Sequence, residues 1–249
     1  MRARWFRALA AGALVLTCGA ITAQENATKT ATKAQEKKQQ ETISGRADYM
    51  RSTWGDKRTV LMKGNVKFVH GNTTMVSDKV EYDEESRIAS SPGKLSISDP
   101  ECDITGDRGS ADFRKRIGVV EGNVVLLVKP KKTEQDTADS NSVKSKLKES
   151  TTITCDRLEY NYRTKVATIT GNVVFKQTGR SATAQKAVYD DKKQFLTLSG
   201  NVKGIDEKGQ TFAAPDSVVI SLKKGEEWIE APNASATFKI DVDEEEKGQ

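Results

Sequence analysis

The sequence is poor in the side chains that most enzyme sites need. Its 249 residues include a single histidine, His70, which stands between Val69 and Gly71 at an expected strand end. No serine, cysteine or acidic partner surrounds it in the arrangement of a catalytic triad. One histidine, with cysteines at unrelated positions, cannot supply a four-ligand zinc site, and no glycine-rich phosphate loop follows a strand and opens a helix. We therefore expect no catalytic residue, no metal and no cofactor.

Long hydrophobic runs are also lacking. The apolar stretch at residues 8–15 follows a basic segment with Arg2, Arg4 and Arg7, and it is far too short for a hydrocarbon core of roughly 30 Å. This order is typical of a signal peptide, which we place at residues 1–23 with cleavage after Ala23. Lipidation at Cys18 is the alternative, and the residue before it, a threonine, disfavours it.

A large excess of one charge is absent too. The formal net charge is +5, and residues 1–23 contribute three arginines and no acidic residue, so removing them leaves 5 − 3 = +2. Phosphate binding needs a basic face rather than mixed charges, so nucleic acid is not an expected partner.

What the sequence does contain is a repeat. The tripeptide Gly-Asn-Val begins at Gly64, Gly122, Gly171 and Gly200. The last two glycines are 29 residues apart, and the first two are 58 apart, or twice 29, with Gly93 at the midpoint. The remaining gap is 49, or 29 plus 20, and the surplus falls in the polar, aperiodic segment 129–150. We interpret that segment as a disordered insertion in a repeat protein.

A second motif keeps the same period. The segment Ser-Asp-Lys-Val-Glu-Tyr-Asp at residues 77–83 recurs in related form at 155–161 and 184–190, and each tyrosine lies 11 residues before the next repeat glycine. Flanking this region, residues 24–42 form a polar linker and residues 241–249 an acidic tail. The repeat domain is therefore placed at residues 43–240.

Within each repeat, apolar residues alternate with polar ones at a period of two, which predicts strands with one dry face and one wet face. The fold class is all-β: an elongated open β-jellyroll or β-solenoid of stacked repeats of about 29 residues. The strand should turn a corner at each Gly-Asn pair. The residues placed on the dry face are Val60, Met62, Val66, Phe68, Val80, Tyr82, Leu95, Ile97, Val120, Val124, Leu126, Leu158, Tyr160, Ile169, Val173, Phe175, Tyr189, Leu196, Leu198 and Val202.

Two cysteines, Cys102 and Cys155, follow the signal peptide. An oxidising compartment allows a disulfide between them. They fall at positions +9 and +13 of their repeats, so they should be offset along neighbouring layers, and this disfavours the bond.

These motifs resemble the OstA-like family, which includes the lipopolysaccharide-transport bridge protein LptA, and the resemblance is clearest in Val-Ala-Thr-Ile-Thr-Gly-Asn-Val-Val-Phe-Lys-Gln at residues 166–177. It covers about residues 44–220, and the family shares its fold with LptC and the N-terminal domain of LptD. It implies an open β-jellyroll in the periplasm that carries lipopolysaccharide from inner to outer membrane, with the dry face lining a groove for lipid A acyl chains.

The resemblance also implies partners. LptC-like and LptD-like proteins would stack on the edge strands, copies of the chain would associate head to tail, and a partner ATPase would supply energy. The insertion and the acidic tail have no counterpart in the family pattern. The absence of a membrane anchor argues against an LptC role, and the absence of a C-terminal barrel argues against LptD.

Two other functions stay open. The first is a structural or adhesive β-solenoid whose interior is filled by its own side chains. The second is a carbohydrate-active enzyme on a β-helix, for which Asp83 and Asp190 are the acidic candidates. Both aspartates precede basic residues in what we interpret as exposed turns.

Overall fold

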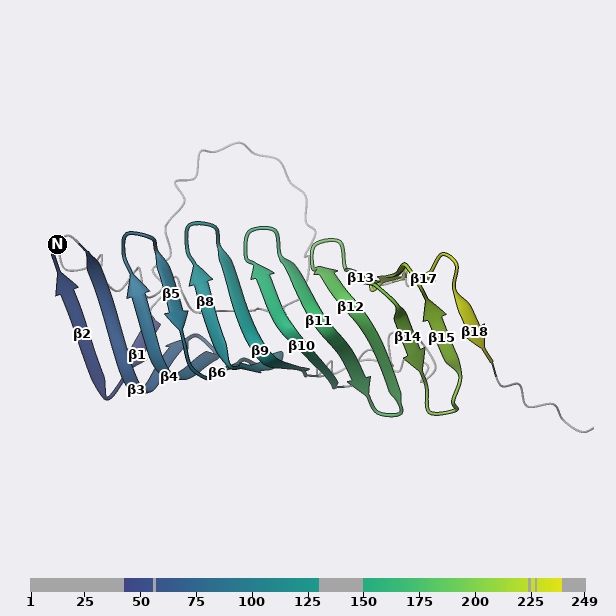
Figure 1. Ribbon diagram of the computed structural model, residues 1–249, viewed down its shortest axis with the longest axis horizontal. Coiled ribbons are helices and arrows are strands. Elements are labelled where there is room, and N and C mark those ends of the chain that lie inside the picture. The colour runs from purple at the N-terminus through teal and green to yellow at the C-terminus, as the bar shows by residue number, and fades with distance from the viewer. Residues whose placement is uncertain (1–42, 56, 130–149, 224, 227, 239–249) are drawn as a thin grey trace, which may run out of the picture.

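The described part of the chain is built from strands alone. The computed structural model describes residues 43–55, 57–129, 150–223, 225–226 and 228–238, and these contain 18 strands and no helix (Figure 1). None of the described residues forms a helix of the length and hydropathy needed to cross a bilayer. The predicted all-β class is confirmed. The predicted signal peptide, linker and acidic tail, and residues 130–149 of the insertion, lie outside the described residues.

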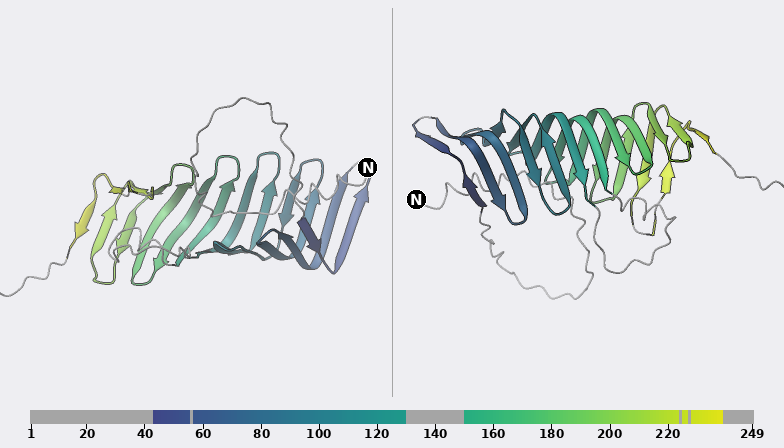
Figure 2. Two further views of the ribbon diagram at one scale, coloured as in Figure 1. Left: turned by 180° about the vertical axis from the view of Figure 1, so that it is seen from behind. Right: turned by 90° about the horizontal axis from the view of Figure 1, so that it is seen from below.

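The strands follow one another along the long axis of the molecule in chain order, as the colours of Figures 1 and 2 show. Their bounds are β1 Ile43–Arg46, β2 Tyr49–Trp54, β3 Arg58–His70, β4 Thr73–Asp83, β5 Ile88–Ser91, β6 Leu95–Ser98, β7 Cys102–Gly106, β8 Arg108–Asp112, β9 Ile117–Val128, β10 Thr151–Asn161, β11 Val166–Gln177, β12 Arg180–Asp190, β13 Phe195–Ser199, β14 Val202–Ile205, β15 Thr211–Ala214, β16 Ser217–Ser221, β17 Trp228–Glu230 and β18 Ser235–Thr237. Each strand pairs with near neighbours in the chain, which confirms an elongated stack of repeats.

The six long strands belong to two layers at once. For example, β3 pairs with β2 through residues 58–63 and with β1 through residues 67–70. We call one layer sheet I. It contains β2, β5, β8, β13, β16 and β17, together with one half of each long strand, such as the first half of β3 and the second half of β4. Sheet II contains β1, the other halves of the long strands, β6, β7, β14, β15 and β18. All pairings are antiparallel. Because one half of each long strand pairs in sheet I and the other half in sheet II, each long strand crosses from one sheet to the other.

On β3, β9 and β11 the crossing occurs at the Gly-Asn pairs, as predicted, whereas β4, β10 and β12 cross at residues 78, 156 and 185, which have no partner in the register. Gly171 and Asn172 have φ values of 78° and 49°, and the pairing register of β11 with β12 shifts between Thr170 and Val173. A glycine tolerates this left-handed conformation at no steric cost, and asparagine tolerates it better than most residues.

An aspartate completes the corners at Gly64, Gly122 and Gly171, a contact that the sequence did not reveal, and at Gly200 the neighbouring side chain is Gln185. The Nδ2 of Asn172 donates to Oδ2 of Asp156 at 2.9 Å, and Asn65 and Asn123 donate in the same way to Asp48 and Asp107. Asp156, the aspartate of the second motif at residues 155–161, therefore has a structural role, because it holds Asn172 of the next strand in its unusual conformation.

Gly93 departs from the pattern. Its φ is not positive, and the chain breaks between β5 and β6 rather than bending within one strand. The preceding residue is Pro92, which has no N–H for the sheet. The expected corner is therefore an interruption at this repeat, and the long strands are replaced by the short strands β5 to β8.

Candidate functional site

In the described part of the chain, the buried apolar side chains lie between the two sheets. Of the 20 residues predicted for the dry face, 17 are buried, and Phe175, Tyr189 and Leu196 are partly exposed. Strand alternation explains the placement, because every second side chain of both sheets turns inward. The burial is therefore continuous along the stack.

Several interior residues escaped the sequence analysis. Cys102 and Ile104 are fully buried on β7, and Ile153, Ala111 and Val218 are also buried. The alternation in Cys-Asp-Ile-Thr-Gly was visible in the sequence. The dry-face set missed it because that set was taken from positions close to the repeat glycine and to the repeat tyrosine, and Cys102 and Ile104 lie between them.

The buried residues of the interior form two clusters, which two partly buried residues join. The first contains Val60, Met62, Val66, Phe68, Val80 and Tyr82, and the second runs from Leu95 to Val218. Met75 and Phe113 pack against both. A pocket lies at the junction, with Phe68, Met75 and Leu95 among its lining residues from sheet II and Ala89, Ser91, Gly109 and Ala111 among those from sheet I. Its void of about 30 Å³ holds about one or two water-sized groups, so a longer ligand requires the sheets to separate.

Asp83 and Asp190, the acidic candidates for an enzyme, each cap a turn of sheet I. Oδ1 of Asp83 accepts the backbone N–H of Ser86 at 2.8 Å, and Oδ1 of Asp190 accepts that of Lys193 at 3.1 Å. The hydrogen bond from Ser86 lowers the pKa of Asp83 below its ordinary value. An ionised turn cap is not a general acid, which favours the interpretation of these aspartates as parts of turns.

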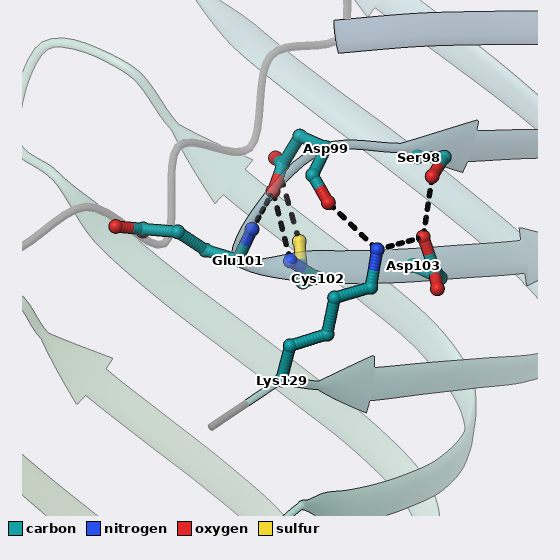
Figure 3. A network of polar contacts seen from close by, with 6 residues as sticks. All are labelled: Ser98, Asp99, Glu101, Cys102, Asp103 and Lys129. Carbon is teal, nitrogen blue, oxygen red and sulfur yellow. Dashed lines mark hydrogen bonds and ion pairs between the residues drawn. The ribbon is translucent and has the colours of Figure 1, made fainter. Parts of the chain in front are cut away.

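A polar network fixes the chain where the insertion begins (Figure 3). Nζ of Lys129 donates to the Asp99 carbonyl at 2.7 Å and to Oδ1 of Asp103 at 2.6 Å. The Lys129 hydrogen bond, and then that from Ser98, lowers the pKa of Asp103. Asp99 in turn accepts the N–H of Cys102 at 2.8 Å. The first residue of the predicted insertion is thus held against the stack.

Cys102 and Cys155 are both buried and no disulfide joins them, in line with the repeat positions, which disfavour the bond. They lie on β7 and β10 and face different residues of β9, Val128 and Val124. Burial raises the pKa of the Cys155 thiol to about 11, so it is protonated and unreactive near neutral pH. Among the described residues no group of three or more histidine, cysteine, aspartate or glutamate side chains is placed to hold a metal ion.

Tyr162 offers a test of the packing of the interior. Its ring meets that of Tyr160 edge-on at 5.2 Å, its hydroxyl is buried without a hydrogen-bond partner among the described residues, and burial raises its pKa. We expect Tyr162→Phe to raise the free energy of unfolding by about 1 kcal/mol, because an unsatisfied buried hydroxyl is removed. Urea unfolding measures the change.

Tyr189 is the matched control. Its hydroxyl donates to Oδ1 of Asp191 at 3.2 Å and accepts from Gln194 at 3.1 Å. Tyr189→Phe should therefore lower the free energy of unfolding by about 1 kcal/mol. Losses of equal size in both variants would contradict the assignment of Tyr162 as unsatisfied.

Comparisons with known proteins give one family. Residues 9–88 and 152–249, more than half of the chain, match the family model described as LptA/(LptD N-terminal domain) LPS transport protein. The unmatched residues between them include β6 to β9, which continue the stack. No curated protein matches. Among solved structures, the chain is similar to LptH, the LptA homologous periplasmic component of the lipopolysaccharide transport device of Pseudomonas aeruginosa, with 12% identity, 68% of this chain and 95% of that chain covered, and a TM-score of 0.41.

Proposed function

Because this chain belongs to the family of LptA and LptD N-terminal domain lipopolysaccharide transport proteins, we propose that it is a periplasmic bridge component. It carries lipopolysaccharide from the inner to the outer membrane and shields the acyl chains between its two sheets. The protein acts by binding and not by catalysis.

The continuous apolar interior is the observation that supports this function. Residues from both sheets, from Val60 on β3 to Val218 on β16, turn buried apolar side chains toward each other. A lipid chain that enters between the sheets gains about 0.8 kcal/mol per buried methylene. Polar head groups stay at the open edge, where the turns of the sheets are solvated.

The ends of the described stack support a place within a longer assembly. On β2, an edge strand of sheet I, Tyr49, Met50 and Trp54 are exposed by 50, 63 and 72%. At the other edge, Trp228 and Ile229 on β17 are exposed by 42 and 56%. Unpaired apolar edges favour strand addition. LptC-like and LptD-like domains, and further copies of the chain, are the partners we propose there.

Site-directed photo-crosslinking in cells tests the cargo. We expect probes at Phe68 and Phe175 to capture lipopolysaccharide, and a probe at Lys176 to capture much less, because neighbouring strand positions face opposite sides of a sheet. Phe68 is buried, Phe175 is partly buried, and Lys176 is exposed. Interior probes that never capture lipid, while the Lys176 probe does, would favour a structural stack filled by its own side chains.

A further inference from the structure

Two neighbouring turns at one edge of sheet I carry unbalanced positive charge. With the last residue of the preceding strand included, the turn between β8 and β9 holds three cations and one carboxylate, Asp112, and the turn between β10 and β11 holds two cations and no carboxylate. The backbone N–H of Tyr162 donates to the carbonyl of Arg116 at 2.9 Å, so the two turns lie side by side. We call them the basic turn pair, whose cations are Arg114, Lys115, Arg116, Arg163 and Lys165.

The positive charge is local. The preceding turn, between β4 and β5, carries Asp83, Glu84 and Glu85 against Arg87. The following one, between β12 and β13, carries two lysines against Asp190 and Asp191. An anion that approaches this edge is therefore attracted to the basic turn pair rather than to the edge as a whole.

Most of these cations lack an acidic partner. Nζ of Lys115 lies 3.5 Å from a carboxylate oxygen of Asp112, and the Arg114 guanidinium donates to the Glu85 carbonyl. Arg116, Arg163 and Lys165 form no ion pair with any described carboxylate. Exposed guanidinium groups in this state suit phosphate, which they bind through two parallel hydrogen bonds.

The pocket between the two core clusters lies directly beneath the turn between β8 and β9. Phe113, the first residue of the turn, lines that pocket, and its ring centroid lies 5.9 Å from that of Tyr82. The sheet I wall is built from small residues, and a Cβ on Gly109 would come within 2.9 Å of Leu95 Cδ2. Leu95 already fills the space over Gly109, so the room in the pocket lies beside the other small lining residues, which include Ala89, Ser90 and Ala111.

We propose that the basic turn pair and this pocket form one site for a phosphate-bearing lipid, with the phosphate on Arg116 and Arg163 and one hydrocarbon chain entering past Phe113. The site rests on the proposed function and specifies the head-group chemistry and the place of entry. The family match omits residues 89–151, which include the pocket wall from Gly109 to Ala111 and the first turn. The site therefore lies partly in residues that the family model matches and partly in residues that it does not match.

The test compares two amphiphiles that share a dodecyl chain and differ in their head group. The full chain is titrated with n-dodecyl phosphate, with n-dodecyl maltoside and with inorganic phosphate, all below micelle formation, by calorimetry. The variant is Lys115→Gln/Arg116→Gln/Arg163→Gln, which keeps Arg114 on the Glu85 carbonyl. Glutamine is tolerated at position 116, because Gln194 has the same place in its turn with φ 58° against 60° for Arg116.

We expect the triple variant to raise the Kd for dodecyl phosphate by about tenfold and the Kd for dodecyl maltoside by less than about twofold. The matched control, Lys63→Gln/Lys176→Gln/Lys203→Gln, removes three exposed cations elsewhere and should leave both values within about twofold. Circular dichroism and thermal unfolding check that both triple variants fold.

The outcomes separate the two proposals. An unchanged Kd for dodecyl phosphate in the triple variant, with maltoside binding intact, would refute the basic turn site and leave the lipid groove standing. Inorganic phosphate that binds as tightly as dodecyl phosphate would replace the lipid site by a simple anion site. A wild-type chain that binds neither amphiphile, together with interior crosslinks that fail, would overturn the proposed function itself.

Discussion

Replacing Ile104 by aspartate is expected to lower the free energy of unfolding by more than about 4 kcal/mol. Ile104 is fully buried on β7, where it faces Ile97 on one neighbouring strand and Leu126 on the other. The substitution removes the packing of an aliphatic side chain and puts a carboxyl group among apolar residues. Urea unfolding followed by circular dichroism measures the loss, and a chain that no longer unfolds cooperatively is the extreme result.

Thr105→Asp is the matched control, because Thr105 is the next residue of the same strand and is exposed. Its change should stay below about 1 kcal/mol, the span of strand propensities. If Thr105→Asp lost more stability than Ile104→Asp, β7 would have the opposite face inward, and equal losses would contradict the burial of Ile104 alone. The comparison also tests the packing of β7, which lies within residues 89–151, the part of the chain that the family model does not match.

The sequence predicts the parts of this fold that repeat locally. The corners at Gly64, Gly122 and Gly171 could be located because each lies inside a strand whose alternation is visible on both sides. The same alternation predicts which side chains point into the interior, as it does for Val66 and Phe68. No knowledge of distant contacts is needed for either prediction.

What the sequence does not predict depends on contacts between separate segments. The Asn65 amide meets Asp48 across 17 residues, and the Arg116 carbonyl meets Tyr162 across the insertion. The pocket exists because the interruption after β5 puts the small residues Ala89 and Gly109 on adjacent strands. The repeat period alone does not reveal this interruption, because the glycine at position 93 keeps the same spacing as the glycines at the bent corners.

Gly171→Ala is expected to lower the free energy of unfolding by roughly 2–4 kcal/mol. The φ of Gly171 is 78°, and a Cβ there would come within 2.7 Å of both Cβ and Cγ of Asp156 and would collide with its Oδ2 as well. Asp156 has little freedom to move away, because Asn172 donates to it at 2.9 Å. The alanine must therefore either adopt a strained conformation or break the contact that holds the corner. Chemical denaturation measures the loss.

Gly93→Ala provides the control at the repeat position where the corner is interrupted. Gly93 has no positive φ, and a Cβ there would meet no atom within 4 Å. Its substitution should change the free energy of unfolding by less than about 1 kcal/mol and is expected to be slightly stabilising, since alanine restricts the unfolded chain. A large loss at Gly93, or none at Gly171, would show that the repeat glycine is not required by the corner. The expected difference instead ties the glycine to the bend by which one strand serves both sheets.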